Sequence, residues 1–261
     1  MNVYLKNDSL EMEPLTDEER IGAARDPLTT PEQLYKLSMD DDACVRYFVA
    51  GNRATPIEAI TRLAHDDDDD VSELAISSAV IQPDTLSELS NHTNVVQRAA
   101  VARHPLTPMN VLIFLSTDVD RHVRANVARN PTTPLSVLNV LSLDEAEDVR
   151  VGIAGNPKVS PALLIQLLER TNHDDIRVLA AAAGNHTLPS NMLVQFVSDE
   201  RPLIRMSAAS NPLLRRVRIS TLHNETEKFS LLNSNAYKGA FLCLVTYSHL
   251  PLKKSHKQNA G

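Results

Sequence analysis

The chain has 261 residues, of which 43% are hydrophobic and 4% aromatic, and its formal net charge is −7. The negative charge disfavours non-specific binding to nucleic acid, which needs Lys and Arg to neutralise phosphates. With two cysteines, no CxxC pair and no zinc-like spacing of ligands, we expect no disulfide framework, metal or cofactor, and with no apolar leader or membrane span we expect a cytoplasmic protein.

Apolar residues recur about every 26 positions through the middle of the chain. We expect residues 1–28 to form an N-terminal cap and residues 29–212 to form about seven repeats. The first apolar residue of each repeat is followed by a second three positions later, which is helical spacing. These first residues are Leu34, Ile60, Leu86, Leu112, Leu138, Ile165 and Leu193.

Each repeat predicts two short helices. The first is expected to begin at a Thr or Ser N-cap followed by Pro. These pairs are Thr30-Pro31, Thr55-Pro56, Thr107-Pro108, Thr133-Pro134 and Ser160-Pro161. An acidic turn follows, whose Asp is expected to cap the second helix. That helix is expected to end at an Asn such as Asn130, because Asn tolerates the left-handed conformation of a helix C-cap.

Two irregularities and the C-terminal segment stand outside this pattern. The repeat that contains Ser72 lacks both Arg and Asn-Pro, and the unit around Arg177 carries two extra residues, which we expect to lengthen its second helix. We expect residues 213–261 to form a C-terminal cap and a partly disordered tail. Helices this short are marginal alone, so the chain is predicted to be an all-α solenoid stabilised by stacking of its layers.

The phrase D-x-x-VR-x-x-VA-x-NP-x-TP-x-x-x-L-x-x-L resembles the leucine-rich repeat variant family over roughly Thr29 to Pro212. The resemblance implies a right-handed superhelix whose units pair an α-helix with a 3₁₀-helix, although an α/α pair as in HEAT or armadillo repeats is also compatible with the sequence. The family's founding type has an N-terminal cysteine cluster for an iron–sulfur centre. This chain has no cysteine before Cys44, so that role is not implied here.

Arginines keep the same period as the leucines. They are Arg46, Arg98, Arg124, Arg150, Arg177 and Arg205. One interpretation is a structural ladder in which each Arg pairs with an acid six residues earlier, such as Asp40 before Arg46. His92 replaces that acid before Arg98 and would leave this pairing incomplete. The alternative is a phosphate-binding face with Arg103, Arg121 and Arg129 nearby. We favour the ladder.

No other group of residues indicates chemistry. The run from His65 to Asp70 is interpreted as a capping turn in preference to a cation site. His104 occupies the Asn position of its repeat and is expected at a helix end, while Cys44 is expected to be buried. No nucleophile motif or acid/base pair stands out, so we predict that the chain is not an enzyme.

The predicted function is a scaffold that binds an unknown protein partner through a concave surface. Recognition would use exposed residues on one row of helices. The candidates are Tyr47, Phe48, Met109, Asn126 and Arg129. The alternative is a HEAT-like solenoid that binds nucleic acid through the arginine column.

Overall fold

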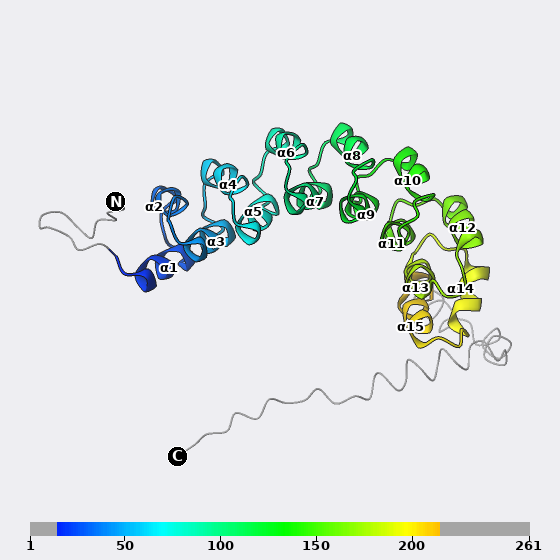
Figure 1. The fold of residues 1–261 in the computed structure, drawn as a ribbon. Coiled ribbons are helices and arrows are strands. Elements are labelled where there is room, and N and C mark those ends of the chain that lie inside the picture. The colour runs from blue at the N-terminus through cyan, green and yellow to red at the C-terminus, as the bar shows by residue number, and fades with distance from the viewer. Residues whose placement is uncertain (1–14, 215–261) are drawn as a thin grey trace, which may run out of the picture. The chain divides into compact units, whose positions relative to one another are not determined.

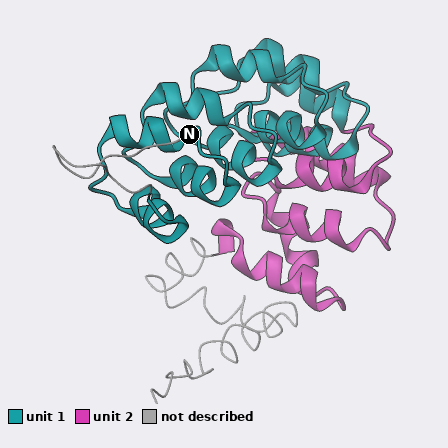
Figure 2. Cartoon of the chain, turned by 60° about the vertical axis from the view of Figure 1, so that its left-hand side comes forward, with its two compact units in different colours: residues 1–141 teal, residues 142–261 magenta. Residues whose placement is uncertain are grey.

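The computed structural model describes residues 15–214, which form fifteen α-helices and contain no strand. This confirms the all-α repeat fold. Both helices of each described repeat are α-helical. The chain divides into two compact units, residues 1–141 and residues 142–261 (Figure 2). The predicted tail, from residue 215 on, and residues 1–14 of the predicted N-terminal cap lie outside the described residues. None of the described helices is long and apolar enough to cross a membrane.

Unit 1 is built from two layers of helices (Figure 1). The inner layer contains α1 (Asp17–Arg25), α3 (Ala43–Gly51), α5 (Asp69–Ile76), α7 (Val95–Arg103) and α9 (Arg121–Arg129). The outer layer contains α2 (Pro31–Leu37), α4 (Ile57–Leu63), α6 (Pro83–Leu89), α8 (Met109–Leu115) and α10 (Leu135–Leu141). From α3 to α9 the starts of the inner helices are evenly spaced along the chain, at the period of the sequence.

Unit 1 bends because its two layers pack differently. Each inner helix packs extensively against the next inner helix, whereas the outer helices make few contacts with one another. Small side chains permit the close approach of the inner helices: Ala100, Ala102, Ala125 and Ala128 are all buried there. The inner layer therefore lies on the inside of the bend, and we call its solvent-exposed surface the inner face (Figure 1).

The leucines of the repeat form the core between the two layers. Leu34, Leu86, Leu112 and Leu138 are fully buried, as is Ile60, and so are nearly all of their partners three residues later. Burying one such side chain contributes about 1.5–3 kcal/mol. The predicted core positions of these five repeats are therefore confirmed. In unit 2 the prediction was wrong by one residue for Ile165, which is only half-buried, because Leu164 and Leu167 face the core there.

The caps of the helices agree only in part with the prediction. Asp42, Asp68 and Asp120 cap the second helices as expected. Thr30 and Ser160 cap first helices through their hydroxyl groups. The expectation was wrong for Thr55 and Thr107, because the N-caps there are the following prolines. Those two hydroxyls are buried, and each donates to a carbonyl of the preceding helix at 2.6 and 2.5 Å respectively.

The asparagines that end the second helices have a different role from the one predicted. Asn52, Asn130 and Asn211 have φ between −60° and −80° with extended ψ, so the left-handed expectation was wrong. Their side chains reach back one repeat instead. Asn130 Nδ2 donates to the carbonyls of Ala102 and His104 at 2.8 and 2.9 Å. Because these carbonyls lie at the end of the preceding inner helix, each asparagine amide links two consecutive repeats.

Unit 2 continues the alternation of helices. Its helices are α11 (Glu147–Gly155), α12 (Pro161–Arg170), α13 (Ile176–Gly184), α14 (Ser190–Val197) and α15 (Pro202–Ser210). Helix α13 packs against both α11 and α15. The two extra residues do not lengthen α13, which has nine residues like α11, so that expectation was wrong. The extra length lies before α13, where α12 is three residues longer than α10, with ten residues against seven.

Candidate functional site

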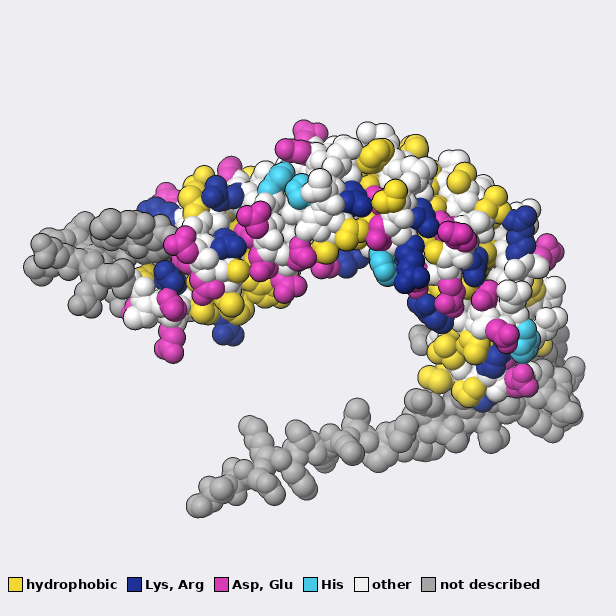
Figure 3. Space-filling view, viewed as in Figure 1, with side chains coloured by type: hydrophobic (Ala, Val, Ile, Leu, Met, Phe, Trp, Pro, Cys, Tyr) yellow, Lys and Arg dark blue, Asp and Glu magenta, His cyan; other side chains and the backbone are white. Residues whose placement is uncertain are grey.

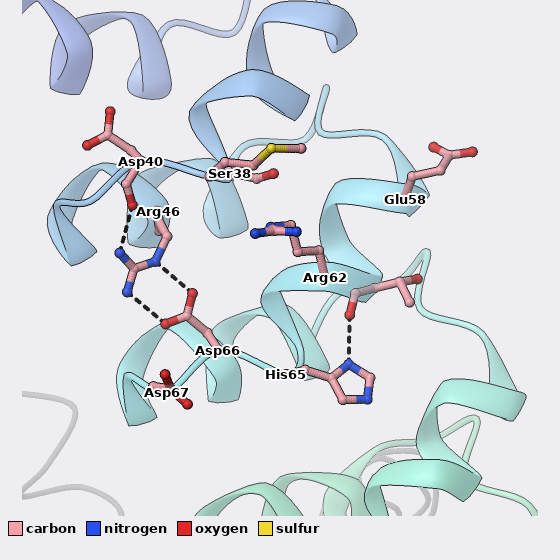
Figure 4. Close-up of a pocket in the computed structure, with 10 residues that line it drawn as sticks. Ser38, Asp40, Arg46, Glu58, Arg62, His65, Asp66 and Asp67 are labelled. Carbon is pink, nitrogen blue, oxygen red and sulfur yellow. Dashed lines mark hydrogen bonds and ion pairs between the residues drawn. The ribbon is translucent and has the colours of Figure 1, made fainter. Parts of the chain in front are cut away.

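The first candidate is the arginine column, and Arg46 shows how it is built (Figure 4). Arg46 Nε and Nη2 donate to the Asp66 carboxylate at 2.7 and 2.9 Å. Its Nη1 donates to the backbone carbonyls of Asp40 and Asp41 at 2.8 and 3.1 Å. The carboxylate partner thus lies further along the chain, in the next repeat. The expectation that the acid six residues earlier supplies the carboxylate was wrong, because that position supplies a carbonyl.

Arg98 repeats this arrangement. It binds the Asp118 carboxylate at 2.7 and 3.1 Å, and its Nη1 donates to the carbonyls of His92 and Thr93 at 2.9 Å each. His92 therefore leaves no gap at Arg98, since only its carbonyl is needed. Bidentate Arg–Asp pairs of this kind are geometrically specific, and they join consecutive repeats.

The other members of the column keep the carbonyl contacts. Arg124, Arg150 and Arg205 each donate through Nη1 to two carbonyls five and six residues earlier. Arg150 Nη2 also reaches Asp175 at 3.4 Å. Arg177 departs from the column: it is half-exposed and pairs backward with Asp148 at 2.8 Å.

Sequence reasoning missed the first member of the ladder. Arg20 lies one repeat period before Arg46, and its Nε lies 3.5 Å from Asp40 Oδ2. Extending the period into the predicted cap would have found it. Helix α1 is thus the second helix of an incomplete first repeat.

One repeat lacks its rung, and a buried glutamine compensates. Ser72 occupies the arginine position and His92 occupies the matching carboxylate position of the next repeat, so both partners are absent together. The Asp66 carbonyl, which an arginine at position 72 would bind, accepts from Gln97 Nε2 at 3.2 Å instead. Gln97 is buried where Val71 and Val123 stand in the neighbouring repeats. The arginine and the acid of this rung are replaced together, which indicates that each Arg–Asp pair has a structural role.

The ladder alters the acidity of its carboxylates. Burial raises the pKa of Asp66, but the hydrogen bonds from Arg46 and from the Asp68 amide, with the Arg46 charge, outweigh it and lower the pKa below its ordinary value. The same balance lowers the pKa of Asp118 beside Arg98. Both carboxylates are therefore ionised partners of the arginines, and these guanidinium groups have few donors left for phosphate.

A hollow of about 710 Å³ lies beside this rung in unit 1 (Figure 4). Its polar walls are largely committed to internal contacts. Arg46 and Asp66 form the rung, and His65 Nδ1 lies 3.0 Å from the Thr61 carbonyl. Asp68, at the edge of the same acidic run, accepts from two amides at the start of α5, which confirms that the run caps this helix.

The second candidate is the inner face of unit 1. Comparing equivalent positions of α3, α5, α7 and α9 separates two classes of residue. Positions that face the core or the ladder keep their chemistry in most repeats, with Ser72 and Gln97 as the exceptions. Positions that face the inside of the bend do not. One such position holds Tyr47, Glu73 and Ala99, with the buried Ala125 in α9, and another holds Gly51, Ser77, Arg103 and Arg129.

The structure divides the predicted partner-contact residues between two layers. Tyr47 and Phe48 lie on α3, and Asn126 and Arg129 lie on α9, all in the inner layer. Met109 begins α8 in the outer layer and is 63% exposed, so it does not share a row with the other four.

The local surroundings of α3 explain which of its side chains are accessible. Phe48 is half-buried beneath the guanidinium of Arg25, 5.0 Å from the ring centre, and packs edge-on against Tyr47. Tyr47 itself is exposed. Cys44 is exposed as well, so the prediction that it is buried was wrong: it is the second residue of α3, whose buried residues are Val45, Val49 and Ala50.

A hollow of about 230 Å³ indents the inner face between α5, α7 and α9. We call it the α7–α9 hollow. It is lined by Glu73, Val95, Val96, Ala99, Ala100, Arg103, His122 and Asn126. Arg103 Nη2 donates to Glu73 at 2.9 Å across one edge. The small side chains of α7 create this hollow, and the sequence analysis singled out only Asn126 and Arg103 among its residues.

Comparison with known proteins adds little beyond the fold. No protein family description matches this chain, and no curated protein matches it. Among solved structures it is similar to one titled "A leucine-rich repeat variant with a novel repetitive protein structural motif". The identity is 23%, the match covers 69% of this chain and 71% of that chain, and the TM-score is 0.47. This is the family that the repeat phrase resembles.

Proposed function

We propose that this chain is a non-enzymatic scaffold that binds a protein partner through the inner face of unit 1. The observation that carries the proposal is the division of residues along α3, α5, α7 and α9. The buried core positions stay mostly apolar and the ladder position holds Arg in three of these four helices. In contrast, one inner position changes from Tyr47 to Glu73 to Ala99, and another changes from Gly51 to Ser77 to Arg103. A surface that repeats its supports but varies its exposed side chains suits recognition of an irregular partner such as a protein.

The alternative of a nucleic-acid interface on the arginine column has less support. Arg46 and Arg98 each use Nε and both terminal nitrogens for acceptors within the protein. Binding phosphate would require breaking these bonds, and the net charge of −7 opposes it further.

Affinity capture from the native host, read by mass spectrometry, tests the proposal. The bait is the full chain, compared with a triple variant of the inner face, Tyr47→Ser, Asn126→Ser and Arg129→Ser. The matched control changes three exposed outer-layer residues, Lys36→Ser, Arg62→Ser and Glu88→Ser. We expect a protein to be enriched on wild type and control and lost from the inner-face variant.

Two results would contradict the proposal. One is that no protein is enriched reproducibly over a mock bait. The other is that enrichment depends on the outer-layer residues and ignores the inner-face changes. Circular dichroism of all three baits shows whether a lost partner reflects lost structure.

A further inference from the structure

The start of α9 differs from the starts of the neighbouring inner helices. At the first two positions α5 has Asp69 and Asp70, which suit the positive N-terminal end of a helix, and α7 has two valines. Helix α9 has Arg121 and His122 there and no acidic residue in its first turn. The positive charge of Arg121 in this place opposes the helix dipole. Departures from a local rule of this kind concentrate at functional sites.

Of these two residues, His122 lines the α7–α9 hollow. Arg121 stands next to it in sequence at the start of α9, and both side chains are exposed. Within the described part of the chain neither side chain forms an ion pair. The adjacent Asp120 carboxylate caps the helix by accepting from the His122 amide at 2.7 Å. Figure 3 shows that basic, acidic and hydrophobic side chains are interspersed over the surface of unit 1.

The floor of the hollow is apolar. Val95, Val96 and Ala99 are partly exposed on α7, and Ala100 lies beneath them. The opposite edge carries Glu73, whose carboxylate is held by Arg103 at 2.9 Å. The hollow therefore combines an apolar floor with a rim that carries His122 on its α9 side, and Arg121 adds a positive charge next to this rim at the start of α9. Its volume of about 230 Å³ is below that of ordinary small-molecule sites, so it suits a single side chain of a larger partner.

From this arrangement we infer that the α7–α9 hollow binds an acidic segment of a partner protein. An aliphatic side chain of the segment rests on Val96 and Ala99, and flanking Asp or Glu side chains meet Arg121 and His122. The inference rests on the proposed function and specifies the partner's chemistry. Complementary charge at the rim would give orientation and a faster association, while the apolar contact would supply affinity.

The surroundings of the hollow favour a peptide over a nucleic acid. A phosphate backbone carries one charge per nucleotide along its whole length. Beyond the hollow it would meet Asp69 and Asp70 on α5, both exposed. A peptide carries its charges only where its sequence places them, so it can present carboxylates to α9 and neutral residues to α5.

Fluorescence anisotropy on the full chain tests the inference with a defined probe. The probe is a short labelled peptide made of Glu and Asp around a central Leu. It is compared with the same peptide carrying Gln and Asn in place of its acids, with the central Leu replaced by Ser, and with a short DNA duplex. We expect the acidic peptide to bind, and each change in the peptide to weaken binding, roughly tenfold for loss of the charges.

The protein variant is Arg121→Glu, and its matched control is Arg62→Glu on the outer helix α4, an exposed arginine outside the ladder. An acidic residue in the first turn of α9 favours the helix, so lost binding in this variant does not come from unfolding. We expect the dissociation constant to rise roughly tenfold for Arg121→Glu and to stay within about twofold for Arg62→Glu.

Three outcomes overturn the inference: equal affinity of wild type and Arg121→Glu, equal affinity for the acidic and the neutral peptide, or tighter binding of the DNA duplex. The proposed function fails separately, through the capture experiment. A partner that is captured through the inner face while the acidic peptide does not bind would leave the scaffold in place and remove only this assignment of its ligand.

Discussion

At the scale of single residues, the asparagine position couples each inner helix to the one before it. In unit 2, Asn185 Nδ2 donates to the carbonyls of Ala154 and Asn156, just as Asn130 does in unit 1. His104 holds this position in α7. Its Nδ1 accepts from the Leu106 amide at 3.1 Å, which places the proton on Nε2, toward the Ser78 carbonyl of the previous repeat. The imidazole thus replaces the amide in chemistry as well as in place.

Burial lowers the pKa of His104, with a smaller opposing effect of the Ser78 carbonyl and a further lowering by Arg103. A histidine whose pKa is lowered in the folded state binds its proton more readily when unfolded. Its contribution to stability is complete above pH 6.5, the ordinary value, and is lost as the pH falls from there toward the folded pKa. An Asn side chain does not titrate, and it can donate to both carbonyls of the preceding repeat, as Asn130 does.

We therefore expect His104→Asn to fold and to lose less stability than wild type between pH 7.5 and pH 5. Urea unfolding followed by circular dichroism at both pH values gives the two differences. The exposed His186→Asn is the control and should keep the wild-type pH dependence. If stability depended on pH equally in wild type and His104→Asn, the pKa of His104 would not differ between the folded and unfolded states.

The contacts of the ladder were only partly predictable from residue spacing. The period placed Arg46 and Arg98 on one column because equal repeats put equal positions on one face. Spacing alone did not decide which acidic turn binds each guanidinium. Asp40 precedes Arg46 by six residues and Asp66 lies in the next repeat, so both were possible partners. That choice depends on how the layers stack. The joint loss of Arg at Ser72 and of the acid at His92 was readable in the sequence and would have indicated the correct pairing.

At the scale of helices, the outer layer depends on its two buried leucines. Helix α8 has seven residues, too few for stability in isolation. Its Leu112 and Leu115 are fully buried, whereas Ile113 on the same helix is 49% exposed. The sequence predicted this helix because its apolar residues have helical spacing. It did not predict where α8 begins, because Thr107 is a favourable N-cap residue and only the stacked structure engages its hydroxyl elsewhere.

Leu112→Ala should lower the free energy of unfolding by about 2–5 kcal/mol, because it removes buried methyl groups and leaves a cavity. Ile113→Ala, in the next position of the same helix, should cost less than about 1 kcal/mol. Chemical denaturation of both variants measures the difference. Similar losses for the two would mean that burial does not distinguish these positions, which would contradict the two-layer core.

At the scale of the whole molecule, each inner helix packs mainly against the inner helices of the repeats before and after it in the same unit. Contacts run from α1 to α3 to α5 to α7 to α9 in unit 1 and from α11 to α13 to α15 in unit 2. Stability in such a chain is close to a sum of layer and interface contributions. The contributions of several carboxylates to stability add in the same way when folding shifts all of their pKa values in one direction. Asp66 and Asp118 in unit 1 have lowered pKa values, and in unit 2 the hydrogen bond from Arg201 lowers the pKa of Asp199 to about 2.

Because these carboxylates bind protons less readily when folded, their contributions are complete above the ordinary value of 3.8 and are lost as the pH falls through the folded values. We expect the urea midpoint to fall steeply between pH 4 and pH 2. Asp66→Asn removes one contribution at every pH, so it should be clearly less stable than wild type at pH 7 and close to it at pH 2. Asp67→Asn, at an exposed neighbour, should follow wild type throughout. A gap between wild type and Asp66→Asn that is the same at both pH values would show that the ionised Arg46–Asp66 rung does not contribute to stability.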